Sequence, residues 1–257
     1  KGIENLKKSE NKISARIIAD SINPAGVRLT SFVLTFPRIV LAEFNTHRAL
    51  SRNSASSRAI PFCKPENKTD MLRIVESNPF IPIRWMKEHE GMQGYEYFDE
   101  VKDSELIQRM KTEWLSARDY NIAREKNLHD FGLTKQIINR LLEPWLWHTV
   151  IATGSEWENF FSLRAEKNAE IHIQDLAYKM LDVYNESTPK SLKPMEWHIP
   201  FGDTFNDSSL KAIHNTEVDV ESPNYWTAYE LLKVKIATAR CARVSYLNFV
   251  GSDNYSA

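Results

Sequence analysis

The sequence predicts an α+β protein in which an antiparallel β-hairpin is followed by several packed helices. Two strand-like runs, 13–20 and 27–36, flank Asn-Pro-Ala-Gly at 23–26, a strong turn signal. Segments further along the chain carry apolar residues at helical spacing. The 257 residues are 42 % hydrophobic and 11 % aromatic, which is enough to build a substantial core. We therefore expect a single folded domain over residues 1–257.

Net charge and cysteine content argue against several classes of protein. The net charge of −1 does not suit a general nucleic-acid binder. The two cysteines, Cys63 and Cys241, offer neither a zinc-site spacing nor a disulfide framework. No apolar run approaches the roughly 18 residues that span a bilayer, and the Lys-rich start, 1–12, has no signal-peptide core. We expect a protein of the reducing cytoplasm without metal or membrane, and with residues missing from one or both ends.

The hairpin is expected to lead into a short helix and then a polar loop. Pro37 suits the first turn of a helix, because its missing N–H is not needed there, so 38–46 is predicted to be helical. Residues 61–99 are rich in Pro, Asn, Lys and Glu and show no clear period. We expect this stretch to be a surface excursion or a lid.

Five helices are expected after this excursion. They span 104–126, 135–143, 156–166, 169–184 and 224–240. Thr134 can cap the second helix, which Pro144 interrupts, and Ser155 with Glu158 forms a capping box for the third. The proline-rich stretch 185–222 is expected to be irregular, and no role is predicted for its histidines.

The stretch 43–61 concentrates anion-binding groups more than any other part of the chain. It contains three arginines, one histidine and four serines: Arg48, Arg52, Arg58, His47, Ser51, Ser54, Ser56 and Ser57. Each can donate hydrogen bonds to phosphate, and arginine can do so bidentately. An apolar run before the stretch and Ala-Ile-Pro at its end indicate an ordered loop. We interpret it as a nucleotide-phosphate site, with a solvated polar loop as the alternative.

Two further arginines lie beside apolar residues on expected helices. Arg140 precedes two leucines, and Arg164 follows the run Asn-Phe-Phe-Ser-Leu at 159–163. A charged arginine in such an aromatic run needs a partner, since burying it unpaired is costly. From the residues alone, Arg140 is either solvated or functional. Arg164 is either paired with a nearby glutamate or part of a site.

The spacing in the polar loop resembles the signature of the flavin-dependent thymidylate synthases. That signature is Arg-His-Arg, seven residues, a serine, and an arginine two residues further on. His47, Arg48, Ser56 and Arg58 occupy its positions here, whereas Thr46 replaces its first arginine. Ser51 and Asn53 also fall in place.

Two segments further along the chain resemble the same family. Arg140 followed four residues later by Pro144 is similar to the family's segment that supplies an arginine to the substrate phosphate. The run 159–165 resembles the family's second signature, in which the arginine meets the pyrimidine and the asparagine meets the flavin.

The chain also departs from the family pattern. Where the family has an asparagine, an arginine and a histidine, this chain has Thr153, Ser155 and Asn168, respectively. Ala-Arg-Val-Ser-Tyr at 242–246 resembles a segment that ordinarily precedes the histidine-arginine loop. The chain therefore resembles a divergent, circularly permuted, phage-type member, and permutation is tolerated where termini lie close together at a surface.

The resemblance implies a reaction and its cofactors. The reaction is the reductive methylation of dUMP to dTMP, with 5,10-methylenetetrahydrofolate giving the carbon, FAD carrying the hydride and NADPH recharging the flavin. The implied fold is that of the thymidylate synthase-complementing protein. Members of the family are homotetramers whose active sites combine several subunits. The implied location is the cytoplasm of a bacterial cell or of a phage-infected host.

The same resemblance implies roles for individual residues. Arg164 would be catalytic, because it would stabilise negative charge that develops on the uracil ring. The flavin would be held by Thr46, His47, Arg48, Ser54, Ser155 and Asn159. The substrate dUMP would be held by Glu43, Ser54, Ser56, Ser57, Arg58, Arg140 and Arg164. No residue is expected to bind a metal.

Two alternative functions stay open at this point. A related flavin- and folate-dependent enzyme could make another 5-substituted pyrimidine, such as hydroxymethyl-dUMP, because the departures from the family pattern leave room for it. A single-stranded nucleic-acid binding module could use Arg48, Arg52 and Arg58 together with nearby aromatic residues. The near-zero net charge argues against this second alternative.

Overall fold

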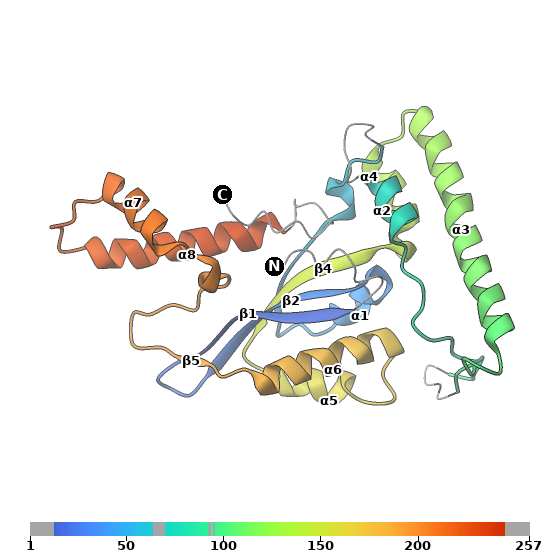
Figure 1. Ribbon diagram of the computed structural model, residues 1–257, viewed down its shortest axis with the longest axis horizontal. Helices are drawn as coiled ribbons and strands as arrows, with labels where there is room; N and C mark the ends of the chain where they lie inside the picture. The colour runs from blue at the N-terminus through green and yellow to red at the C-terminus, as the bar shows by residue number, and fades with distance from the viewer. Residues whose placement is uncertain (1–12, 64–69, 92–93, 95, 245–257) are drawn as a thin grey trace.

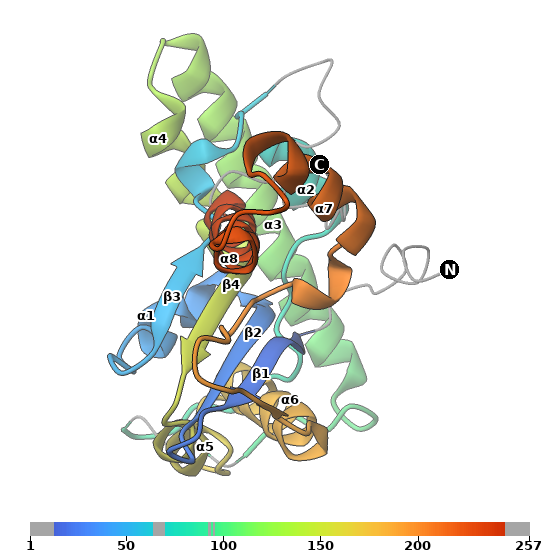
Figure 2. The ribbon, with the colours of Figure 1, turned by 90° about the vertical axis from the view of Figure 1, so that its left-hand side faces the viewer.

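A computed structural model describes residues 13–63, 70–91, 94 and 96–244, and these form a helix-flanked, five-stranded sheet (Figure 1). The strands are β1 (Ser14–Ile22), β2 (Arg28–Pro37), β3 (Ser51–Ser54), β4 (Trp147–Gly154) and β5 (Lys190–Ser191). Their order is β3-β4-β2-β1-β5, and all neighbours are antiparallel except β1 and β5. Figure 2 shows β3, β4, β2 and β1 side by side. The predicted α+β class is confirmed.

Helices form the rest of the described chain. They are α1 (Leu41–Phe44), α2 (Met71–Ser77), α3 (Ser104–Asp130), α4 (Lys135–Ile138), α5 (Glu158–Arg164), α6 (Ile171–Glu186), α7 (Asp207–Glu217) and α8 (Tyr225–Arg243). Four 3₁₀ segments connect them: η2 (Arg38–Val40), η3 (Ser57–Ala59), η4 (Asn139–Trp145) and η5 (Gly202–Thr204). None of the helices in the described ranges combines the length and apolarity needed to cross a membrane.

The hairpin forms where the sequence predicts it. The side chain of Asn23 accepts hydrogen bonds from the backbone N–H groups of Ala25 and Val27, at 3.0 and 2.9 Å, which closes the turn. Gly26 has φ +82°, a conformation that favours glycine. The strands pair from Ser14 with Thr35 to Ile22 with Arg28.

Three apolar clusters hold the elements together. One sheet face packs against α1, α5 and α6, through buried residues that include Phe32, Phe44, Trp157 and Ile173. A second cluster joins α2, α3 and η4, which lie beyond one end of the sheet (Figure 1). The third joins the sheet to the end of α8 through Ile151 and Val244. In Figure 1, α7 and α8 extend on the side of the sheet that is away from α3.

The expected surface excursion over 61–99 is wrong for its first half. Met71, Val75 and Phe80 are fully buried, so α2 and the residues after it belong to the core. The sequence hid this helix because it is only seven residues long, too short for a clear period. The later part fits the expectation better, since residues 87–91 are exposed.

Several other local predictions need correction. The strands β3 and β4 were not expected, and neither was α7 within the supposedly irregular stretch 185–222. The helix expected from 156 begins at Glu158, and its N-cap is Trp157, with no capping bond from Ser155. Thr134 does cap α4 by accepting from the Gln136 N–H. The helices expected at 104–126, 169–184 and 224–240 are confirmed as α3, α6 and α8.

A carboxylate on β1 joins the hairpin to the end of α6. Asp20 accepts hydrogen bonds from Arg28 at 2.9 and 2.7 Å, from Thr30 at 2.9 Å and from Ser187 at 2.6 Å. Its side chain is only 5 % exposed. Burial alone would raise the pKa of Asp20, but the hydrogen bonds from Arg28, Ser187 and Thr30 outweigh burial and lower it.

We expect Asp20→Ala to lower the free energy of unfolding by about 3–5 kcal/mol, because it leaves Arg28 without its charge partner. Folding lowers the pKa of Asp20. The contribution of this group to the stability of the wild type is therefore present above the unfolded pKa of about 4, and it is lost as the pH falls through the folded pKa. Urea unfolding at pH 7 and pH 3 measures both effects. Asp182→Ala, on the exposed side of α6, is the matched control and should be close to wild type.

Candidate functional site

The helix α1 and the aromatic side chains beneath it position the first half of the site. Phe44 is fully buried and lies against Phe36 and Phe160, with ring centroids 5.3 and 5.7 Å apart. The ring of His47 packs edge-on against the same Phe160 at 4.8 Å. These contacts fix the start of the polar loop on the sheet, and they leave Glu43 partly exposed on the neighbouring turn.

Arg164, at the end of α5, connects two residues of that first half. Its Nε donates to Nε2 of His47 at 3.0 Å, and its Nη1 donates to a carboxylate oxygen of Glu43. The three side chains come together although Arg164 is 121 residues from Glu43 in the chain. The glutamate partner that a buried arginine requires is therefore present. The Arg164 side chain is still 20 % exposed, so one side of the guanidinium can meet a ligand.

The surroundings shift the pKa of both partners of Arg164. Burial lowers the pKa of His47, and the nearby guanidinium groups of Arg164 and Arg52 lower it further. His47 is therefore neutral at pH 7, and because Nε2 accepts from Arg164, its proton resides on Nδ1. Burial raises the pKa of Glu43, and the charge of Glu170 adds to this, while Arg164 opposes it. Burial and Glu170 prevail over the ion pair.

The polar loop, 43–61, starts at the end of α1 and continues through β3 into the 3₁₀ turn η3. β3 pairs with β4 from Ser51 with Thr153 to Ser54 with Val150. Arg52 donates to the backbone oxygen of His47, so this arginine closes the loop. Ser54 and Ser56 are half-buried.

The arginines Arg48 and Arg58 are exposed, and within the described part of the chain neither side chain has a hydrogen-bond or ion-pair partner. Both can therefore bind an external anion. Arg140 on η4 is likewise exposed and has no such partner among the described residues. The segment η4, which carries Arg140, packs against the η3 turn, which carries Arg58.

The remaining predicted residues are less closely tied to this site. Ser57 is buried, and its hydroxyl donates to Glu143 at 2.6 Å. The hydroxyl of Thr46 donates to the backbone oxygen of Glu43 at 2.7 Å. Asn159 and Ser155 are exposed, on α5 and just before it. These last two are not joined to the loop by any described hydrogen bond.

The end of α8 reaches the polar loop. The side-chain amide of Asn53 on β3 donates to the backbone oxygen of Cys241 at 2.6 Å. The described part of the terminal segment, 242–244, thus begins next to the polar loop in space. In the family that the chain resembles, this segment comes before the loop in the sequence. Ser245 and Tyr246 lie outside the described residues.

Four contact residues in this region were missed by reasoning from the sequence. They are Arg38, Asn139, Glu143 and His148. Burial, together with the charge of Arg38, lowers the pKa of His148 to about 3, so its ring is neutral. The sequence carried no signal for these four residues, because each contacts a residue far away in the chain.

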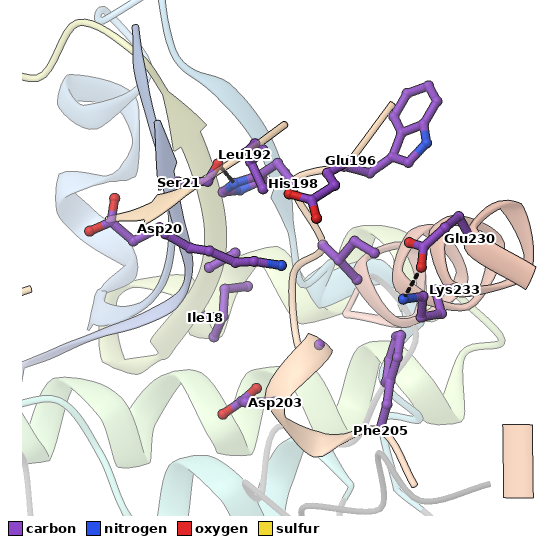
Figure 3. A pocket seen from close by; sticks show the side chains of 15 residues that line it. Ile18, Asp20, Ser21, Leu192, Glu196, His198, Asp203, Phe205, Glu230 and Lys233 are labelled. Carbon is purple, nitrogen blue, oxygen red and sulfur yellow. Dashed lines mark hydrogen bonds and ion pairs between the residues drawn. The ribbon is translucent and has the colours of Figure 1, made fainter. Parts of the chain in front are cut away.

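A separate cavity of about 320 Å³ lies where β1 and β5 meet the chain after β5 and the helix α8 (Figure 3). There His198 is held between two hydroxyls, with Nδ1 2.8 Å from Ser21 and Nε2 2.9 Å from Ser31. Its charged lining is of both signs and includes Lys190, Glu196 and an ion pair between Lys233 and Glu230. None of the residues predicted for the site lines this cavity.

The residues around Arg164 fit a flavin in their donor chemistry. Among the described residues, the guanidinium of Arg48 and the side-chain amide of Asn159 have no hydrogen-bond partner, and such groups suit a diphosphate and a ring carbonyl. The side-chain oxygen of Asn168, just after α5, is buried and accepts no hydrogen bond from any described residue, so a ligand N–H would satisfy it. Within the described ranges, no three His, Cys, Asp or Glu side chains are placed to hold a metal ion.

The fold resembles that of solved structures of one protein, a methylase. The chain is similar to the UMP/dUMP methylase PolB from Streptomyces cacaoi bound with 5-Br UMP, with a TM-score of 0.52 and 16 % identity over 68 % of this chain and 90 % of PolB. The same methylase bound with 5-Br dUMP matches with a TM-score of 0.53 and 14 % identity, over 68 % of this chain and 91 % of PolB. No protein-family model and no curated protein matches the sequence. At this identity the similarity concerns the fold.

Proposed function

We propose that this chain is a flavin-dependent thymidylate synthase, which converts dUMP to dTMP with 5,10-methylenetetrahydrofolate, FAD and NADPH. The observation that carries the proposal is the contact of Arg164 with Glu43 and His47. It lies at the start of a loop in which Arg48 and Arg58 have no partner among the described residues. The sequence pointed to these residues separately, and they meet in one place. The fold that the chain shares with a UMP/dUMP methylase supports a pyrimidine nucleotide as the substrate.

The substrate phosphate would be bound at the second half of the loop. Ser54, Ser56, Arg58 and Arg140 would neutralise and orient it, which suits bidentate guanidinium donors and hydroxyls. Ser57 would contribute its backbone N–H, because its hydroxyl hydrogen is already donated to Glu143.

The uracil ring would face Arg164. As C5 of the ring becomes nucleophilic, negative charge develops on the ring, and a fixed guanidinium stabilises that charge. Glu43 and His47 hold the guanidinium on its inner side, so that its remaining N–H groups are available to the pyrimidine. This preorganisation is what makes Arg164 a candidate catalytic residue.

The cofactor would lie against the first half of the loop and α5. FAD supplies the hydride chemistry when bound. Six side chains would bind it through hydrogen bonds, and these are Thr46, His47, Arg48, Ser54, Ser155 and Asn159. We further propose a cytoplasmic homotetramer with active sites shared between subunits.

Visible absorption of the purified protein tests this proposal. We expect bound oxidised flavin, either retained on purification or taken up from added FAD, and a shift of its bands when dUMP is added. With the folate donor and NADPH, mass spectrometry should then identify dTMP, and a product heavier by one oxygen would indicate hydroxymethyl-dUMP instead.

A protein that binds neither FAD nor dUMP would contradict the proposal. Tight, salt-sensitive binding of a single-stranded oligonucleotide by such a flavin-free protein would support the nucleic-acid module instead.

A further inference from the structure

The short turn that carries Arg58 is held by three side chains from one neighbouring segment. Lys135 on α4 and Asn139 and Glu143 on η4 all reach this turn with their side chains. The amide of Asn139 donates to the backbone oxygens of Ser57 and Ile60, at 2.8 and 3.0 Å. Lys135 donates to the oxygen of Ala59 at 3.2 Å. We call this set the η3 clamp.

One of the three clamp residues is buried, and a second is partly buried. Asn139 is fully buried, and its two carbonyl acceptors fix the orientation of its amide. Glu143 accepts from the buried hydroxyl of Ser57 at 2.6 Å, and it also pairs with Arg38 at 3.3 Å. The guanidinium of Arg38 lies 3.2 Å from Nε2 of His148, a neutral ring on β4. The clamp therefore ties the turn to the sheet.

The same segment also carries Arg140, the residue next to Asn139. Arg140 and Arg58 are both exposed, and they stand on two elements that the clamp fastens to each other. A phosphate bound between two arginines requires both to be held at a fixed separation, because a misplacement of about 1 Å can cost as much as 10²-fold. The clamp supplies that constraint without using either arginine.

We infer that Asn139 and Glu143 are positioning residues for the nucleotide phosphate. They set the distance from Arg140 to the pair Ser56 and Arg58. This inference rests on the proposed function, since it assumes that the loop binds the phosphate of dUMP. It gives a part in phosphate recognition to a buried residue, Asn139, and a partly buried one, Glu143, that hold the turn in place.

The test compares dUMP with deoxyuridine, which lacks only the phosphate. Isothermal titration calorimetry of the full-length, FAD-supplemented protein gives the ratio of the two affinities. Asn139→Ala and Glu143→Ala should each lower this ratio about tenfold, the scale of one or two lost hydrogen bonds, while deoxyuridine binding changes little. Glu143→Gln should restore most of the ratio, because its amide oxygen can still accept from Ser57 and Arg38. Gln136→Ala, an exposed neighbour on α4, is the matched control and should leave the ratio at the wild-type value.

Each outcome decides the inference. Equal losses for dUMP and deoxyuridine, or no loss for either, would show that Asn139 and Glu143 serve folding alone, and would overturn it. If the wild-type protein prefers dUMP and the two alanine variants have a lower ratio of dUMP to deoxyuridine affinity, the inference is supported. A wild-type protein that binds dUMP no better than deoxyuridine has no phosphate site, and the inference then fails even if the flavin is bound. A wild-type protein that binds neither compound overturns the proposed function, and the inference falls with it.

Discussion

Replacing Arg164 with alanine is expected to lower kcat/KM for dUMP about 10²- to 10³-fold, the usual cost of losing one preorganised donor to developing charge. The loss should appear in kcat as well as in KM, because the guanidinium stabilises charge that forms only as the ring reacts. Steady-state kinetics of the FAD-loaded enzyme, with the folate donor and NADPH in excess, measures both constants.

Two further variants make this result specific. Arg164→Lys keeps the charge but loses the fork that contacts Glu43 and His47 together, so it should recover only part of the activity. Arg109→Ala removes an exposed arginine from α3 and should behave like wild type. Stability is expected to change by no more than about 1 kcal/mol in Arg164→Ala, because both partners of the ion pair are partly exposed. An Arg164→Ala enzyme with flavin bound and unaltered dUMP kinetics would remove Arg164 from the mechanism.

The second large effect concerns a carboxyl group far from the loop. Glu125 on α3 is fully buried, and neither of its oxygens has a hydrogen-bond partner in the part of the chain that the structure describes. Burial raises its pKa to about 8, so the folded protein keeps it protonated at neutral pH. Because the folded pKa lies above the unfolded value of about 4.3, stability from this group is fully present at low pH. It is lost progressively as the pH rises from about 4.3 through about 8.

We therefore expect Glu125→Gln, which has nearly the same shape and cannot ionise, to match wild type at pH 4 and to exceed it by a few kcal/mol at pH 8.5. Urea unfolding of both proteins at the two pH values measures this difference. Glu105→Gln, at the exposed start of the same helix, controls for the general effect of removing a carboxylate. A Glu125→Gln protein whose advantage over wild type does not grow with pH would show that Glu125 finds a partner or water in solution.

The parts of the fold that the sequence predicted are those with strong local signals. The hairpin has Asn-Pro-Ala-Gly at its turn, and α6 has a regular apolar face with Ile173, Leu176 and Met180 buried. The strand β4 was missed, although it pairs with both β2 and β3. Val150, Ile151 and Ala152 are consecutive and all buried, so this central strand shows no alternation between a polar and an apolar face.

The residues of the candidate site also divide into those that the sequence could predict and those that it could not. The loop and Arg164 could be found from spacing, because their residue types are those that anion and pyrimidine recognition require. Asn139 and Glu143 could not, since their partners in the η3 turn are 82 and 86 residues away in the chain. Only tertiary packing brings a buried amide onto two particular carbonyl groups. Whether the predicted residues bind FAD and dUMP stays a prediction.

The position of β4 also has a kinetic consequence. β4 lies between β2 and β3, so β3 cannot join the sheet until β4, which comes much later in the chain than β3, has inserted. Such long-range pairings form slowly, because the entropy of closing a long loop must be overcome before the contacts form. Arg164 follows β4 in the chain, and its contacts with Glu43 and His47 depend on the same insertion. These contacts should therefore form later in folding than the hairpin of β1 and β2.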